Sequence, residues 1–237
     1  MKIKILFNNK TISKQFIGGW GFSCLVDGRF SFDTGESAEY LSKNMQTMGI
    51  DTSLIEAIVL SHDHWDHTGG LVAILGKKSG VKVYGCPGFS QELKHKIKLL
   101  NGNLVETDKL YEINQNIFIT GTIPGVYKGT PIDEQALIVR TVNGITIITG
   151  CAHPGILNMV EIVKDWFTDD RIYAVLGGFH LHATSYDEIV QIARRFKELK
   201  VAKAGPAHCS GDPAIDIFQE LYGNNFLNVL GGITLEV

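Results

Sequence analysis

Three histidines and two aspartates lie within six consecutive residues in the first third of the chain, in the block SHDHWDHTGG from residue 61 to residue 70. Imidazole nitrogens and carboxylate oxygens are ligands for zinc, iron and manganese, and a zinc–nitrogen bond is only about 2.0–2.1 Å long. His62 and His64 alternate along the chain, so they can point to the same side of an extended loop. Asp66 and His67 follow two and three residues after His64 and could face a second metal. The block therefore predicts a metal site.

Three later histidines repeat one pattern, in which an apolar strand and a glycine-containing turn precede the histidine. They are His153, His180 and His208. Glycine lets the backbone bend sharply and approach closely. Because sites in sheets form at the carboxyl ends of strands, these strand ends and the block at 61–70 could meet at one edge. One histidine after a strand is usually a loop or capping residue, but four such strand ends together predict clustered ligands.

Two histidines lie outside this pattern. His95 is part of a polar helical stretch and is expected to be exposed to solvent. His182 follows His180 by two residues, and we expect it at the rim of the site or behind a ligand.

The elements that must position these residues are short strands and amphipathic helices. Apolar or β-branched segments bounded by Gly, Asn, Asp or Pro predict the strands. They cover residues 3–7, 22–26, 30–33, 57–60, 81–84, 117–120, 136–142, 145–149, 173–176 and 228–230. The dipeptide Asn143-Gly144 predicts a tight hairpin turn. A 3.6-residue repeat of apolar side chains predicts helices near residues 38–48, 156–166 and 189–199.

Strands followed by helices occur twice along the 237 residues, in halves of about 1–115 and 116–237. Two such halves, packed sheet against sheet with helices outside, satisfy the rule that every apolar face must be covered. The sequence therefore predicts a single α/β (α+β) domain over residues 1–237.

Composition and charge exclude several other classes of protein. Hydrophobic residues make up 44% of the chain and charged residues 20%, which excludes a disordered chain. The net charge of −3 disfavours a nucleic-acid partner. The apolar runs are too short for a signal peptide or a membrane helix, and the four cysteines are widely spaced. A cytoplasmic protein with reduced thiols and no membrane partner is therefore expected.

The motifs, taken together, resemble those of the metallo-β-lactamase superfamily. The block from residue 62 to 67 is similar to its HxHxDH motif, and the sequence around Asp33 resembles its upstream aspartate motif. His153 and His208 resemble its later histidines, so the resemblance covers nearly the whole chain. It implies a four-layer αββα sandwich with a binuclear metal site between the edges of two sheets.

The resemblance also implies two sets of metal ligands. The first metal would be held by His62, His64 and His153. The second would be held by Asp66, His67 and His208. Asp33 would lie behind these ligands and orient the loop that carries the histidine block. Two zinc ions are the expected cofactors, and manganese or iron are the alternatives.

His180 stands where the superfamily usually has an aspartate that bridges the two metals. It could be a terminal ligand, or it could act as a general acid. The segments at 133–137, 150–155, 178–181 and 207–211 resemble the branch that contains archaeal dihydropteroate-synthase-type proteins of methanopterin biosynthesis. Bacterial relatives in that branch are commonly labelled metal-dependent hydrolases.

The resemblance implies a metal-dependent hydrolase. Two metals would lower the pKa of a bound water, and the resulting hydroxide would attack an ester, amide or phosphoester of a small molecule. Asp66 could both ligate a metal and orient the nucleophile, with His180 as the second candidate catalytic residue.

Three other classes of function stay open. The main alternative is a synthase or transferase that joins a pterin to an aromatic amine, and the others are a di-iron redox protein and a non-catalytic metal-binding module. A thiol nucleophile at Cys151 or Cys209 is a weaker interpretation than a small buried cysteine near the ligands.

Two loops are expected to shape the substrate pocket. The loop that joins the first two strands carries Trp20, and the loop before residue 133 carries Tyr127 and Lys128. Their aromatic rings would suit a flat substrate, and Lys128 or Lys14 could meet a phosphate or carboxylate, although ordinary solvated lysines are the simpler interpretation. We therefore expect a small-molecule substrate with aromatic and anionic parts, and leave a homodimer open.

Overall fold

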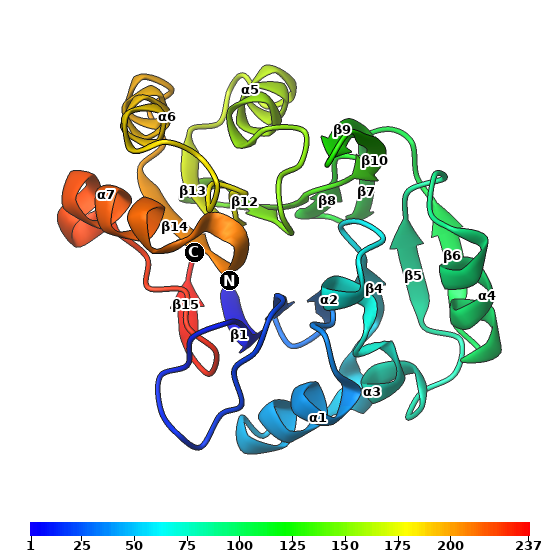
Figure 1. Cartoon of the computed structure of the whole chain (residues 1–237). Helices are drawn as coiled ribbons and strands as arrows, with labels where there is room; N and C mark the ends of the chain where they lie inside the picture. The colour runs from blue at the N-terminus through cyan, green and yellow to red at the C-terminus, as the bar shows by residue number, and fades with distance from the viewer.

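Two sheets that face each other form the centre of the structure (Figure 1). The computed structural model describes all residues from 1 to 237. The first sheet has seven strands in the spatial order β15-β1-β2-β3-β4-β5-β6. They are β1 (Lys2–Phe7), β2 (Ser23–Val26), β3 (Phe30–Phe32), β4 (Ala57–Val59), β5 (Lys82–Gly85), β6 (Asn103–Glu106) and β15 (Thr234–Glu236). Neighbours from β3 to β6 are parallel, whereas β15, β1, β2 and β3 pair antiparallel.

The second sheet has six strands in the order β14-β13-β12-β11-β8-β7. They are β7 (Tyr111–Asn114), β8 (Ile117–Ile119), β11 (Leu137–Thr141), β12 (Gly144–Thr149), β13 (Ile172–Gly178) and β14 (Lys203–Ala207). Strands β12, β13 and β14 are parallel. A separate hairpin is formed by β9 (Ile123–Tyr127) and β10 (Thr130–Glu134).

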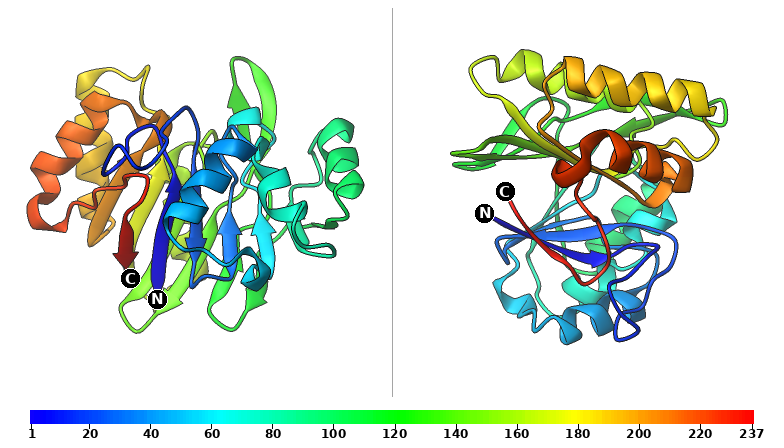
Figure 2. Two further views of the ribbon diagram at one scale, coloured as in Figure 1. Left: turned by 90° about the horizontal axis from the view of Figure 1, so that it is seen from below. Right: turned by 90° about the vertical axis from the view of Figure 1, so that its left-hand side faces the viewer.

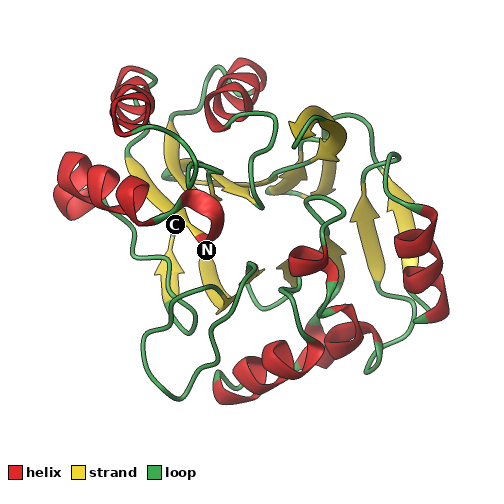
Figure 3. Cartoon of the chain, viewed as in Figure 1, coloured by secondary structure: helices red, strands yellow, loops and turns green.

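Apart from the short α2 (Trp65–Thr68), which lies at the edge of the sandwich and carries Asp66 and His67, the helices lie on the outer side of each sheet, as the right-hand view of Figure 2 and the colouring of Figure 3 show. The other helices of the first half are α1 (Ala38–Thr47), α3 (Leu71–Leu75) and α4 (Gln91–Leu99). Those of the second half are α5 (Ile156–Trp166), α6 (Tyr186–Glu198) and α7 (Asp212–Tyr222). Short 3₁₀ turns are η1 (Thr52–Leu54), η2 (His208–Ser210) and η3 (Gly223–Asn225). No helix combines the length and the apolar character needed to span a membrane.

Apolar side chains form three separate layers. One layer lies between the sheets and contains Ile148 and Leu176, whereas their strand neighbours Ile147 and Val175 pack beneath the helices of the second half. A third layer lies beneath the helices of the first half. Because successive side chains of a strand point to opposite faces, a sheet covered on both faces requires continuous apolar strands, which the sequence has. The three layers confirm the predicted αββα sandwich.

Some predicted elements need correction. Residues 228–230 form no strand, and the last strand is β15, which returns to the first sheet beside β1. The predicted loop before residue 133 contains the β9–β10 hairpin. The sequence patterns missed α7, and they predicted β14 only as the strand before His208, without bounds. Strand β14 contains Gly205 and Pro206, which break a strand pattern, but its position at the edge of the sheet tolerates proline.

The strand ends that carry the candidate site residues lie at one edge of the sandwich. Strand β3 ends directly before Asp33, and β4 leads into the block at 61–70. Strands β12, β13 and β14 lead to His153, His180 and His208. Since the strands of each group are parallel neighbours, their carboxyl ends point the same way, and the loops that follow them can meet.

The loop that joins β1 and β2 is tied to α1 by one buried side chain. Asn44 donates hydrogen bonds to the carbonyls of Leu6 and Ile17 at 2.9 and 2.8 Å, and it accepts one from the amide of Ile17 at 2.8 Å. We expect Asn44→Ala to lower the free energy of unfolding by about 2–4 kcal/mol, because it leaves buried backbone groups without partners. Gln46→Ala, at an exposed position of the same helix, should change it by less than about 0.5 kcal/mol. Urea denaturation of both variants measures the difference, and equal midpoints would contradict it.

Candidate metal centre

The carboxylate of Asp33 organises the loop that carries the histidine block. Its Oδ1 accepts a hydrogen bond from the amide of Ser61 at 2.7 Å. Its Oδ2 accepts from the Ser61 hydroxyl at 2.7 Å and from Nδ1 of His67 at 2.6 Å. All three residues are fully buried. Asp33 thus fixes both the start of the block and the orientation of the His67 ring, so that Nε2 of His67 faces inward.

The hydroxyl of Ser61 orients a second ring. Because this hydroxyl donates to Asp33, it accepts a hydrogen bond from Nδ1 of His62 at 2.8 Å. This pattern assigns the proton of His62 to Nδ1 and leaves a lone pair on Nε2. Nε2 of His62 lies 3.0 Å from Nδ1 of His64.

Two glycines allow the chain to pack closely around this cluster. A Cβ atom at Gly70 would lie 2.0 Å from the carbonyl oxygen of Thr34, and a Cβ at Gly150 would lie 2.1 Å from the Ser61 hydroxyl. Any side chain at either position would therefore push the strand ends apart. Gly150 belongs to the second half, so its close approach brings the two sheets together at the site.

In the second half, the carboxylate of Glu134 organises the turn that carries His153, as Asp33 does for the histidine block. The sequence patterns did not identify Glu134 as a site residue. Its Oε1 accepts hydrogen bonds from the amides of Cys151 and Ala152 at 2.9 and 2.7 Å. Its Oε2 accepts from the amide and from Nδ1 of His153, both at 2.8 Å. Glu134 is fully buried, and Nε2 of His153 is inaccessible to solvent and has no hydrogen-bond partner. A buried nitrogen with a free lone pair is what a metal ligand requires.

The ring of His208 is held by the loop between β1 and β2. Its Nδ1 donates to Oδ1 of Asn9 at 3.1 Å, and its backbone amide donates to Oδ1 of Asn8 at 3.2 Å. These contacts direct Nε2 of His208 inward, where it lies 3.3 Å from Nε2 of His67.

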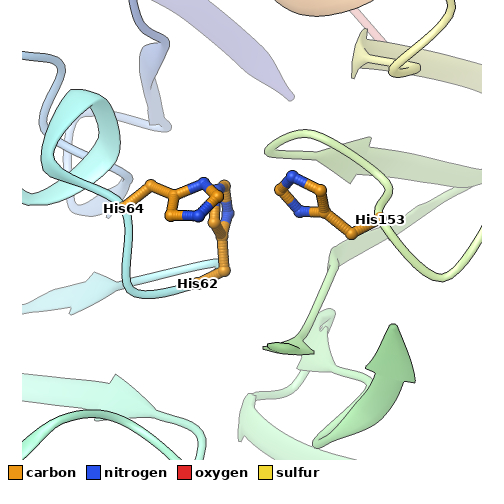
Figure 4. Close-up of side chains that lie close together, drawn as sticks. All are labelled: His62, His64 and His153. Carbon is orange, nitrogen blue, oxygen red and sulfur yellow. The ribbon is translucent and has the colours of Figure 1, made fainter. Parts of the chain in front are cut away.

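The donor atoms converge in two groups. In the first group, the rings of His62, His64 and His153 face one another across the gap between the halves (Figure 4), with their ligand atoms all within 4.8 Å. The second group contains Asp66, His67 and His208. The structure thus brings together all six residues that the resemblance assigns to the two metals.

The spacing within the second group fits one metal ion. Nε2 of His208 lies 3.3 Å from Nε2 of His67 and 3.2 Å from Oδ2 of Asp66, and the latter two atoms are 3.5 Å apart. Nitrogen and oxygen ligands about 2.0–2.2 Å from a tetrahedral zinc ion lie about 3.3–3.5 Å from each other. The donor set and its spacing therefore suit a divalent cation.

The buried charges of the site are paired. Burial opposes a charge on His67, but the Asp33 carboxylate outweighs burial and raises the pKa of His67 to about 9. Burial and the neighbouring ring of His67 hold the pKa of His62 well below its usual value. Burial alone would raise the pKa of Glu134, but the hydrogen bonds from His153 and the backbone amides lower it. Glu134 is therefore a carboxylate.

His180 and His182 lie beside the donor atoms and line the same hollow. The ring of His180 is 4.6 Å from that of His153, centroid to centroid, and its buried Nδ1 has no hydrogen-bond partner. A hydrogen bond with Cys209 raises the pKa of His180. His182 is exposed and also lines this hollow, but its Nδ1 donates to the carbonyl of Cys209 at 3.2 Å, and it belongs to neither group of donor atoms.

Four non-glycine residues at the centre have left-handed backbone conformations. Asp33, Ala152, His180 and His208 have φ angles of 53°, 64°, 54° and 49°. Such residues are uncommon and cluster at functional sites, because they persist only where the surrounding contacts enforce them.

Three hollows surround the donor atoms. The central one, of about 220 Å³, is lined by two members of each group of donors and by Trp20, Trp65 and Tyr127. A second, of about 730 Å³, adjoins it on the side of Tyr127 and Lys128. A third, of about 590 Å³, adjoins it on the side of Trp20 and His208. Lys14 lines none of the three.

Trp65 belongs to the candidate site as well, although the sequence analysis did not name it. Its side chain is 62% exposed beside the donor atoms. Its position inside the histidine block was the available signal.

Comparisons with known proteins agree on one family. Residues 28–130 match the family model described as "Beta-lactamase superfamily domain". A relative from Methanocaldococcus jannaschii, 7,8-dihydropterin-6-methyl-4-(beta-D-ribofuranosyl)-aminobenzene-5'-phosphate synthase, is 30% identical over 87% of this chain and 84% of its own length. The chain belongs to the metallo-β-lactamase superfamily.

Solved structures show the same fold. The crystal structure of a metal-dependent hydrolase of the beta-lactamase superfamily superposes with a TM-score of 0.83 and 32% identity, over 100% of this chain and 99% of the other. A diphosphatase from the PhnP family has a TM-score of 0.61 with 14% identity, over 100% and 97% of the two chains, and at that identity it supports the fold alone.

The role of Glu134 can be tested by Glu134→Gln. We expect this variant to bind zinc about 10–100-fold more weakly, because its amide cannot accept all four hydrogen bonds and the His153 ring loses its orientation. Competition with a chromogenic chelator measures the affinity. Asp133→Asn is the control, since Asp133 belongs to neither group of donor atoms and does not line the central hollow, and it should leave the affinity unchanged. Equal affinities for the two variants would contradict this role.

Proposed function

We propose that this protein is a metal-dependent hydrolase that holds two divalent cations, with zinc as the first expectation, and cleaves an ester, amide or phosphoester bond of a small molecule. The observation that carries the proposal is the inward orientation of four histidine rings, each held at its outer nitrogen by Asp33, Ser61, Glu134 or Asn9. Such outer acceptors fix the tautomer and raise the basicity of a ligating imidazole.

His62, His64 and His153 would hold one cation, and Asp66, His67 and His208 the other. Bound cations would polarise a substrate oxygen and lower the pKa of water at the site. The remaining steps belong to side chains of this chain. Trp20, Trp65 and Tyr127 form apolar walls that restrict water around the bound substrate. Asp66 offers a second carboxylate oxygen that can orient the attacking water.

His180 is proposed to donate a proton to the leaving group. It belongs to neither group of three donors described above, and it lines the central hollow together with Tyr127. The ring centroids of Tyr127 and His180 are 5.8 Å apart, so a substrate held against Tyr127 lies near the imidazole. Lys128, whose Nζ lies 5.0 Å from the centroid of the Tyr127 ring, would attract an anionic substituent in the neighbouring hollow.

A synthase is the second candidate, and the arrangement of hollows favours it. Two larger hollows adjoin the central one, one beside Tyr127 and the other beside Trp20 and His208, so two molecules could enter separately and meet at the donor atoms. The relative from Methanocaldococcus jannaschii is named for a product that joins a dihydropterin to an aminobenzene ribose phosphate. This chain would then join an aromatic amine to a pterin that carries a leaving group.

One experiment tests both candidates. Protein purified without added metal should contain about two zinc or manganese ions per chain by elemental mass spectrometry. The reason is that each of the two groups of donor atoms can hold one ion. Loaded protein should hydrolyse chromogenic esters or phosphodiesters, and a chelator should abolish this activity. A product that forms only when a dihydropterin and an aromatic amine are supplied together would favour the synthase. Absence of metal even after reconstitution would refute both.

If His180 is a proton donor and not a ligand, its loss should affect turnover but not metal binding. His180→Ala should retain both metals and lower turnover of the best substrate by about 10²–10⁴-fold, because a positioned proton donor contributes that much. Elemental analysis and steady-state kinetics measure the two quantities on the same sample. His95→Ala is the control, since His95 is exposed on α4, belongs to no group of donor atoms and lines none of the three hollows. Loss of a metal from His180→Ala would make His180 a ligand, and unchanged turnover would exclude both roles.

A further inference from the structure

Two of the four buried cysteines lie in a polar environment. Cys24 and Cys86 pack within the apolar layers, one between the sheets and one beneath the helices of the first half. Cys151 and Cys209 are equally buried but belong to none of the three layers. A cysteine that serves only as a small hydrophobe is expected among apolar side chains. The surroundings of Cys151 and Cys209 therefore require another explanation.

The sulfur of Cys151 lies between the two groups of histidines. It is 3.3 Å from Nε2 of His67. Its Sγ forms three different clusters in which all ligand atoms lie within 4.8 Å of one another. These clusters pair Cys151 with His62 and His67, with His153 and His180, and with His208 and Cys209. Among the side chains in these clusters, Cys151 alone occurs in three.

We propose that the sulfur of Cys151 is a metal ligand at this centre, shared between the two groups of donor atoms. The inference rests on the proposed metal centre. It changes which metals the centre prefers, because the ligand atoms then include sulfur as well as nitrogen and oxygen. A nitrogen ligand and a sulfur ligand bound to one tetrahedral zinc ion at about 2.0–2.1 and 2.3 Å lie about 3.5 Å apart. The observed separation of Cys151 and His67 is close to that value.

The local backbone supports this position of the sulfur. Glu134 accepts hydrogen bonds from the amides of Cys151 and Ala152, so the carboxylate that orients His153 also fixes the backbone of Cys151. Ala152 has φ = 64°, and this turn lets both the sulfur and the imidazole two residues later face the centre. Cys209 is the neighbouring thiol, and its sulfur lies 3.6 Å from the carbonyl of Cys151.

A sulfur ligand makes the centre selective. Thiolate sulfur favours zinc and other soft cations over magnesium and calcium, which prefer oxygen ligands. Metal binding must also displace the thiol proton, since a coordinating thiol is bound as the thiolate. We therefore expect zinc or cobalt to bind strongly and magnesium to bind without involving Cys151.

The test uses the full-length protein loaded with cobalt(II). Wild type and Cys209→Ala should show a sulfur-to-cobalt charge-transfer band in the near ultraviolet, and Cys151→Ala should lose it. Cys151→Ala should also bind zinc at least about tenfold more weakly, given that loss of an outer partner alone costs 10–100-fold. Cys86→Ala, which removes a buried thiol from an apolar layer, is the matched control and should retain the band. A band that survives in Cys151→Ala, or disappears only in Cys209→Ala, would overturn the proposal.

A second measurement needs no variant and covers the case in which Cys151→Ala does not fold. X-ray absorption of the zinc-loaded wild type should show a sulfur neighbour at about 2.3 Å in addition to nitrogen and oxygen neighbours. Bound zinc with only nitrogen and oxygen neighbours would exclude Cys151 as a ligand and leave the metal centre intact. Failure to bind zinc at all would refute the metal centre and this inference together.

Discussion

Two buried carboxylates, Asp33 and Glu134, hold the candidate centre in place, one in each half of the sandwich. A charge removed from water is tolerated only when hydrogen bonds or an opposite charge compensate it. Asp33 accepts three hydrogen bonds and Glu134 accepts four. In each case one of these bonds comes from Nδ1 of a histidine, which turns the other nitrogen inward. Without the carboxylates, the rings would be free to rotate and the donor atoms would not converge.

The centre also depends on the spacing of the two sheets. Catalytic and metal-binding side chains must be held within about 0.5 Å of their working positions. The apolar layer between the sheets sets this spacing, and Gln135 fixes it at the site itself. The amide of Gln135 donates to the carbonyl of Ser61 at 2.8 Å, and its side chain donates to the carbonyl of Leu60 at 2.8 Å. Gln135 thus joins the second half directly to the start of the histidine block.

The strained backbone of the centre is supported by the surrounding layers. Each non-glycine residue in a left-handed conformation costs about 1–3 kcal/mol. Such residues occur at Asp33, Ala152 and His208, where strand ends must bend sharply to bring donors together. The three apolar layers beneath these turns are rigid, so the turns cannot relax without separating packed side chains. Packing far from the donors therefore contributes to the geometry of the site.

Local sequence determined most of the strands, the α1 and α5 helices and the four histidine-bearing strand ends, because apolar runs, 3.6-residue repeats and glycine turns act over a few residues. Only the tertiary structure decided which outer partners and sulfurs reach the centre. Glu134 and His153 are 19 residues apart in sequence, and Cys151 and His67 are 84 apart. Residues 228–230 have the apolar pattern of a strand, yet β15 takes the place beside β1. Contacts between two sheets depend on how the sheets pack, and no short-range pattern records that packing.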